Sequence, residues 1–152
     1  MRLSVLKTQK DVSSVKKGDF VDSENASLLE KVAGRKVFVN PLRVKNFHKS
    51  EALVKSVAEG ESVFAIPLSF LLQAKGAARA KLLKDLKAFF RLCYKMKAKF
   101  VFTNAFAQSK FDLKSKREAK AIGSLFTLTP LQAKKAFGMG GEEEQCLSEH
   151  KK

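Results

Sequence analysis

Short apolar runs alternate with segments of helical periodicity along the first hundred residues. The apolar runs predict five strands, at residues 3–6, 20–21, 36–40, 63–66 and 100–105. In the run 100–105 the apolar residues are consecutive rather than alternating, which is typical of a strand covered on both faces in a parallel sheet. Because helical segments separate the strands, the pattern predicts parallel β-α-β units with right-handed crossovers.

The segments outside these runs predict six helices. We expect them over residues 9–17, from Asp22 or Ser23 to a stop at Gly34, over about eight residues from Ser50, over 74–96, from a cap at Ser115, and from Pro130 to Phe137. Ser115 with Glu118 has the spacing of a capping box. The longest helix has one apolar stripe at spacings of three and four, which we expect to cover the sheet. Its members are Leu82, Leu86, Phe89, Cys93 and Met96.

The length of 152 residues suits one domain of the α/β class. A complete eight-stranded α/β barrel typically needs about 250 residues, so a full barrel does not fit. We expect residues 1–137 to form a single domain. Residues 138–152 are expected to form a flexible charged tail, because their glycines and charges do not support packing.

The charge balance changes this picture most. The chain has 30 basic and 15 acidic residues, a net charge of +15 and a pI near 10.0. Two of the bases and four of the acids follow residue 137, so residues 1–137 have a net charge of +17. Such a domain attracts polyanions through phosphate neutralisation and counterion release. A Lys-rich soluble protein and a membrane-surface protein are the weaker interpretations of the same charge.

Catalytic chemistry is sparse by comparison. Histidine occurs only at His48 and His150, and the predicted strand ends offer few polar side chains: Asp22, Asn40, Ser69 and Asn104. A metal site or a nucleophilic triad needs more converging ligands than these. Cys93 lies in an apolar helix stripe, and both it and Cys146 are expected to be free thiols. No signal peptide or spanning segment is evident, and we expect a cytoplasmic protein that binds no cofactor itself.

Three groups of cations are candidates for RNA contact. The first surrounds a predicted helix start, where backbone N–H groups add donors for phosphate oxygens: Lys110, Lys114, Ser115, Lys116 and Arg117. The second is the polar face of the longest helix, with Lys84, Lys87, Arg91 and Lys95, and the third is the loop with Arg43, Lys45 and Lys49. Solvated surface charge is the alternative for each group. Phe47, Phe106 and Phe111 are predicted in loops, where burial is favoured over base stacking.

Four segments near the C-terminus resemble a known family. They are Phe102-Thr103-Asn104-Ala105, residues 112–118, residues 125–129 and residues 132–137. Together they resemble the C-terminal part of the archaeal and eukaryotic ribonuclease P protein component 3 family, and the likeness extends more weakly back to about Phe38. The chain departs from the family pattern at Lys114, Lys116, Glu118 and Thr127, where the family has Arg, Pro, Asp and Gly.

This resemblance implies an incomplete TIM-barrel-like fold, short of one or two strand–helix units, with about five mainly parallel strands and covering helices. It also implies a non-catalytic protein subunit of ribonuclease P, in which the RNA cleaves precursor tRNA and binds the magnesium. The implied partners are ribonuclease P RNA, precursor tRNA and other protein subunits, including a small ferredoxin-like companion. A general RNA- or ribosome-associated protein and a diverged barrel hydrolase remain alternatives.

Overall fold

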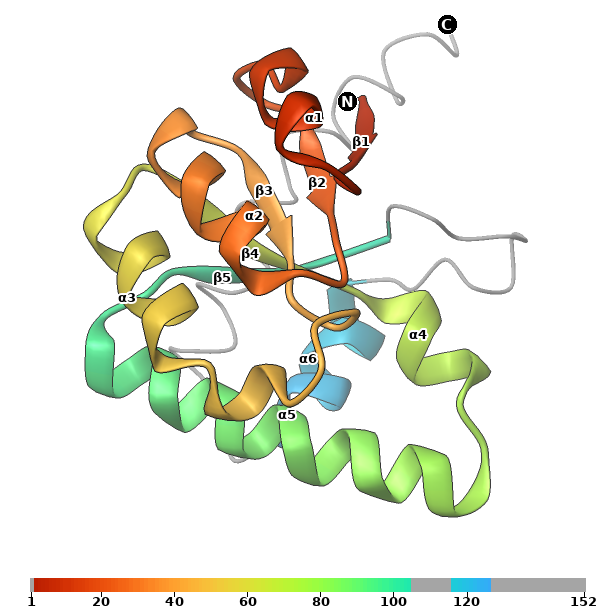
Figure 1. Cartoon of the computed structure of the whole chain (residues 1–152). Coiled ribbons are helices and arrows are strands. Elements are labelled where there is room, and N and C mark those ends of the chain that lie inside the picture. Colours follow the sequence, from red (N-terminus) through yellow and green to blue (C-terminus); the bar gives the residue numbers. More distant parts are fainter. Residues whose placement is uncertain (1, 105–115, 127–152) are drawn as a thin grey trace, which may run out of the picture.

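The sheet is parallel throughout and its strands follow chain order. The computed structural model describes residues 2–104 and 116–126 (Figure 1). Within them the sheet has the order β1-β2-β3-β4-β5, and each neighbouring pair is parallel. The strands are β1 (Leu3–Val5), β2 (Phe20–Asp22), β3 (Phe38–Asn40), β4 (Val63–Pro67) and β5 (Phe100–Thr103). All five predicted strands are therefore confirmed, as is the α/β class.

Helices connect the strands and cover one face of the sheet. They are α1 (Gln9–Ser14), α2 (Ala26–Val32), α3 (Glu51–Glu59), α4 (Leu68–Gln73), α5 (Gly76–Met96) and α6 (Lys116–Ser124), with short 3₁₀ helices η1 (Ala33–Arg35) and η2 (Phe47–Lys49). Strands in chain order with helices on the same side curve like a segment of a barrel. The architecture is consistent with an incomplete TIM-barrel-like fold.

The two faces of the sheet have separate apolar clusters. On the helix-covered face, Val21, Val39 and Phe64 lie in register across β2, β3 and β4 and join the main core. The opposite face has a smaller cluster that includes Phe20, Ala65 and Val101. Alternation of side chains along each strand produces this division, because successive residues point to opposite faces.

Aromatic rings fix α5 on the sheet. Phe89 is fully buried and packs edge-on against Phe64 of β4 and Phe47 of η2, with ring centroids 5.0 and 5.4 Å apart. One residue later, Phe90 stacks on Phe100 of β5 at 4.5 Å. Such ring pairs add about 0.5–1.5 kcal/mol each beyond their buried area. The long helix is thus held in one position along its axis. Its apolar stripe lies on the sheet, as predicted.

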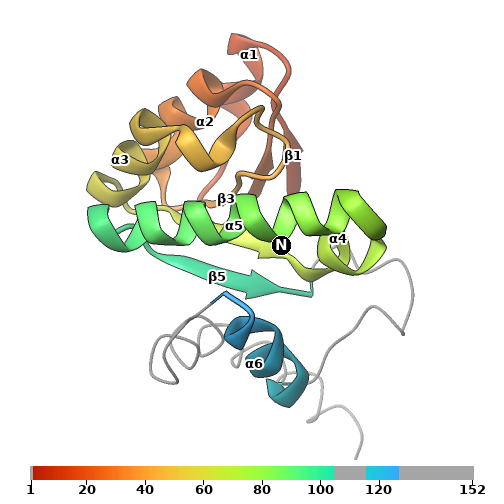
Figure 2. The same cartoon turned by 90° about the horizontal axis from the view of Figure 1, so that it is seen from below.

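The helix α6 lies past the β5 edge of the sheet. Figure 2 shows it below β5, away from the other strands. Phe126, just after α6, is 3% exposed and contacts the rings of Phe90 and Phe102 at 5.1 and 5.9 Å. The aromatic core therefore extends from α5 across β5 to the end of α6.

Two local predictions are corrected, and one helix was not predicted. The cap of α2 is Asn25, whose side chain accepts from the Ser27 N–H at 3.0 Å, because the Asp22 carboxylate binds Arg43 and the Ser23 hydroxyl donates to the Leu6 carbonyl. The chain after α2 continues as η1, so Gly34 does not stop it. The helix α4 was not predicted from the sequence. The predicted helix 130–137, the tail 138–152 and Cys146 lie outside the described residues.

Gly60 provides a stability test with an internal control. A Cβ at Gly60 would lie 2.4 Å from the backbone oxygen of Ala33, whereas one at Gly34 would meet nothing within 4 Å. We expect Gly60→Ala to lower the free energy of unfolding by about 1–3 kcal/mol, because the backbone must shift to relieve the overlap. Urea denaturation of both variants measures this, and equal stability of Gly60→Ala and Gly34→Ala would contradict the packing described.

Candidate nucleic-acid interface

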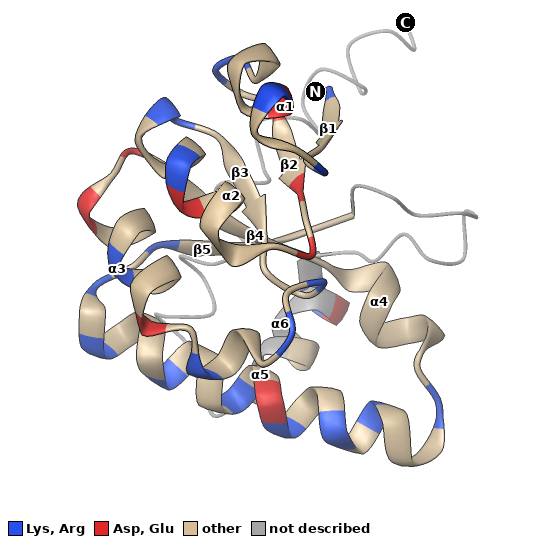
Figure 3. Ribbon diagram, in the orientation of Figure 1, with Lys and Arg blue, Asp and Glu red and all other residues tan. Residues whose placement is uncertain are grey.

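The helix α5 and its flanks concentrate the positive charge of the chain. Residues 75–99 include nine Lys or Arg and a single acid, Asp85, which is a net charge of +8 out of the total of +15. Figure 3 shows these bases spaced along the whole length of α5. This segment of 25 residues therefore accounts for more than half of the net charge, and α5 within it is the longest helix of the described chain.

Burial and hydrogen bonding together divide the bases of α5 into three groups. Lys81, Lys84, Arg91 and Lys95 are exposed, and Lys87 is half-buried. Arg79 differs, because its guanidinium donates to the backbone carbonyls of Ala74 at 2.6 Å and Leu72 at 2.9 Å, where it holds the end of α4. Lys84, Lys87, Arg91 and Lys95 were predicted as contacts, while Lys81 was missed although it precedes Lys84 by three residues, the spacing of one helix face.

The single acid of α5 lies beside η2. Asp85 lies 3.8 Å from Nδ1 of His48 on η2, and both side chains are mostly buried. The other ion pairs of the described residues are Arg43–Asp22 and Lys55–Glu59. No Lys or Arg of α5 therefore has an acidic partner within the described part of the chain. Their charge is available to an external anion.

The contact between η2 and α5 places the end of the predicted loop cluster beside the long helix. The loop after β3, which includes Arg43 and Lys45, leads into η2, whose last residue is the exposed Lys49. Phe47 of η2 is 6% exposed and packs against Phe89 of α5. This burial confirms that Phe47 is a core residue and does not stack on a base.

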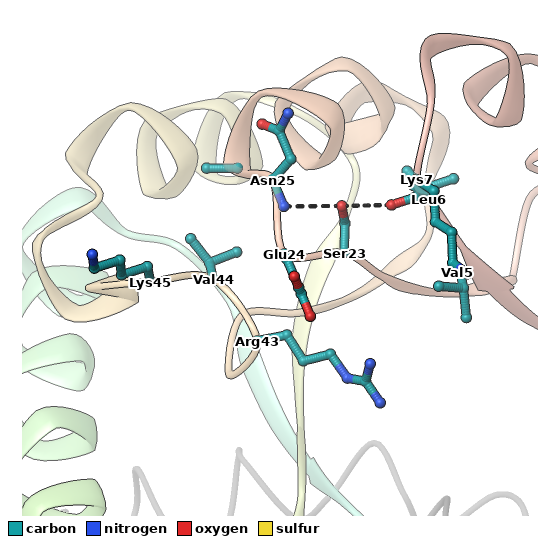
Figure 4. A pocket seen from close by; sticks show the side chains of 10 residues that line it. Val5, Leu6, Lys7, Ser23, Glu24, Asn25, Arg43, Val44 and Lys45 are labelled. Atoms are coloured by element: carbon teal, nitrogen blue, oxygen red, sulfur yellow. Dashed lines mark hydrogen bonds between the residues drawn. The ribbon is translucent and has the colours of Figure 1, made fainter.

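Arg43 lies at the carboxyl ends of β1, β2 and β3. A cleft of about 640 Å³ opens there between the loops after these strands (Figure 4). Arg43 donates from Nε to Oδ2 of Asp22 at 2.8 Å, and its side chain is 48% exposed. The cleft also has Lys7, Glu24 and Lys45 on its walls, and Figure 4 shows Glu24 on the same side as Arg43.

Asp22 is the more deeply buried of the two acids beside this cleft. It is 5% exposed, and its Oδ1 atom is buried without a hydrogen-bond partner. Burial raises the pKa of the Asp22 carboxyl above its usual value of 3.8, and the nearby Arg43 opposes that rise. The pair therefore fixes the base of the β3–η2 loop, at the cost of desolvating a carboxylate.

The described residues hold few catalytic groups. No cluster of three or more His, Cys, Asp or Glu side chains suited to a metal ion occurs in residues 2–104 and 116–126. Cys93 is fully buried and desolvation raises the pKa of its thiol, which makes it a poor nucleophile. The strand-end hydroxyl of Ser23 is occupied by the Leu6 carbonyl and the Asn25 N–H.

The cluster predicted around residue 114 is only partly visible. Arg117 is exposed in the first turn of α6, and Lys116 begins that helix. Lys110, Lys114 and Ser115 lie outside the described residues, as do Phe106 and Phe111, so their roles stay predictions.

Comparisons with known proteins add no assignment. No family model matches the chain, and no curated protein matches it. In the part of the chain that the structure describes, no helix has the length and apolar character needed to cross a lipid bilayer.

Removing Arg43 should destabilise the fold, because the buried Asp22 carboxylate would lose its cation. We expect Arg43→Gln to lower the free energy of unfolding by about 1–3 kcal/mol, since Asp22 then loses its cation. Lys45→Gln, two residues away and exposed, should change it by less than about 0.5 kcal/mol. Urea denaturation at neutral pH distinguishes the two, and equal effects would show that the Arg43–Asp22 pair does not stabilise the fold.

The raised pKa of Asp22 also predicts how the free energy of unfolding changes with pH. The folded protein binds the Asp22 proton more tightly than the unfolded chain, so the contribution of this group is most favourable below pH 3.8 and is lost as pH rises through the higher folded-state pKa. We expect the stability of the wild type relative to Asp22→Asn to fall as pH rises through this window. Denaturation at a series of pH values checks it, and the opposite slope would mean that Arg43 outweighs desolvation.

Proposed function

We propose that this chain is a non-catalytic protein subunit of ribonuclease P that binds the catalytic RNA and assists 5′ maturation of precursor tRNA. The observation that supports RNA binding is the row of exposed cations without acidic partners on α5. The assignment to ribonuclease P rests on the resemblance of residues 102–137 to the component 3 family.

The proposed mechanism is electrostatic. Lys and Arg side chains neutralise phosphates, release counterions and reduce repulsion between closely packed RNA strands. The RNA supplies cleavage chemistry and binds magnesium, and the protein favours the active RNA fold. The proposed partners are precursor tRNA and the other protein subunits, including the small ferredoxin-like companion.

The alternative is a general RNA- or ribosome-associated protein, because charge alone does not select one RNA. Purification of the tagged chain from cells, followed by sequencing of the bound RNA, separates the two. Enrichment of ribonuclease P RNA supports the proposal, whereas enrichment of ribosomal RNA alone supports the alternative. Recovery of no RNA would contradict both.

RNA affinity should depend steeply on salt. If six or more phosphates are contacted, affinity should fall about 10³-fold or more between 50 and 200 mM monovalent salt. Fluorescence anisotropy with ribonuclease P RNA measures this dependence. A flat response would remove the electrostatic basis of the proposal.

Neutralising the exposed row should reduce that dependence. In the combined variant Lys84→Gln, Arg91→Gln and Lys95→Gln, we expect the slope of log affinity against log salt to fall in magnitude by about 2–3, since each lost phosphate contact removes about 0.7–0.9. The control has the same charge change on exposed lysines at and after α1: Lys10→Gln, Lys16→Gln and Lys17→Gln. An equal loss in both variants would mean that net charge, rather than the α5 surface, binds RNA.

The cluster near α6 has its own test. Changing Lys114, Lys116 and Arg117 together to Ala should weaken stimulation of the RNA-only cleavage reaction, because phosphate contacts are lost while the circular dichroism spectrum stays unchanged. Full stimulation by this variant would remove the cluster from the proposed interface.

A further inference from the structure

The exposed face of α5 combines many cations with almost no aromatic surface. The aromatic residues of α5 that point inward, Phe89 and Phe90, are at most 1% exposed. Tyr94 is 40% exposed at the margin of this face, and its ring lies edge-on to Phe100 at 5.6 Å. Along the described length of α5 and η2, no other aromatic ring is exposed.

The near absence of exposed aromatic rings on this face indicates which form of RNA it binds. Proteins that bind single strands stack bases on aromatic side chains, and each stacked base contributes about 1–3 kcal/mol. Sequence-specific RNA recognition likewise uses aromatic platforms and hydrogen bonds to unpaired base edges. The α5 surface offers long cationic side chains in their place, which contact phosphates and do not read sequence.

The cations are attached at fixed intervals along one helix. Lys81 and Lys95 are fourteen residues apart on one helix, which separates them by about 21 Å along its axis. Both ends of the helix are fixed: Arg79 binds the end of α4, and Lys97 in a left-handed conformation closes α5 through its N–H. Cations attached at fixed points along one helix axis suit phosphates that are already fixed, as in an A-form duplex, whereas a single strand must lose conformational freedom to match this spacing.

We infer that the exposed face of α5 binds the phosphate backbone of base-paired RNA without reading its sequence. This inference rests on the proposed RNA binding and names the form of RNA that the surface accepts. The protein then recognises helical segments of its RNA by shape and charge.

Anisotropy measurements with the full chain test this directly. The probes are an RNA duplex of about 16 base pairs, the span of small duplex-binding domains, its separated strands, and a duplex of unrelated sequence. At equal salt we expect the duplex to bind about tenfold more tightly than either strand, and the two duplexes to agree within about threefold. Equal binding of single strands, or a tenfold preference for one duplex sequence, would overturn the inference.

Two variants make the test specific to α5. The triple change Lys84→Gln, Arg91→Gln and Lys95→Gln should abolish the preference for duplex, whereas Lys10→Gln, Lys16→Gln and Lys17→Gln should keep it. Tyr94→Leu should leave duplex affinity within about twofold, because stacking does not contribute. A tenfold loss in this last variant, with an unchanged circular dichroism spectrum, would overturn the inference.

The outcomes separate this inference from the proposed function. Tight but unselective binding of single strands would leave RNA binding intact and reject the duplex preference. Duplex preference without stimulation of ribonuclease P RNA would support the inference and reject the assignment to ribonuclease P.

Discussion

The packing of α5 on the sheet through Phe89 and Phe90 is the interaction on which the rest of the structure depends. These rings contact β4, β5, η2 and Phe126, which lies two residues after the end of α6, so they join elements that are distant in sequence. A buried aromatic removed from such a site typically costs about 3–5 kcal/mol. Because the apolar stripe is fixed inward, the polar stripe of the same helix must face solvent in one orientation.

Because of this packing, the cations of α5 form a surface with a defined orientation. Lysines scattered along a flexible segment would present no defined array, but on α5 they lie along a helix held at both ends. The single acid, Asp85, is mostly buried and lies beside His48. The cleft beside Arg43 has a different character, because Asp22 and Glu24 offset its cations. The cleft therefore lacks the uniformly positive character of the exposed α5 face.

Much of the fold follows from local patterns, whereas the site depends on contacts between distant residues. The five strands and most of the inward face of α5 were predictable, since apolar runs and a spacing of three and four residues are local properties. The predicted stripe omitted Phe90, which is 1% exposed. The cap at Asn25 was not, because Asp22 and Ser23 are equally good capping residues and only their partners Arg43 and Leu6 exclude them. The approach of η2 to α5 joins residues about forty positions apart, and no local pattern indicates it.

Crosslinking of the protein to reconstituted ribonuclease P RNA, followed by mass spectrometry of nucleotide-bearing peptides, identifies the surface that contacts RNA. If α5 is that surface, crosslinked nucleotides should concentrate on peptides from residues 80–97. Crosslinks confined to peptides of α1 and α2, or an absence of crosslinks at an RNA concentration that saturates binding, would contradict this assignment.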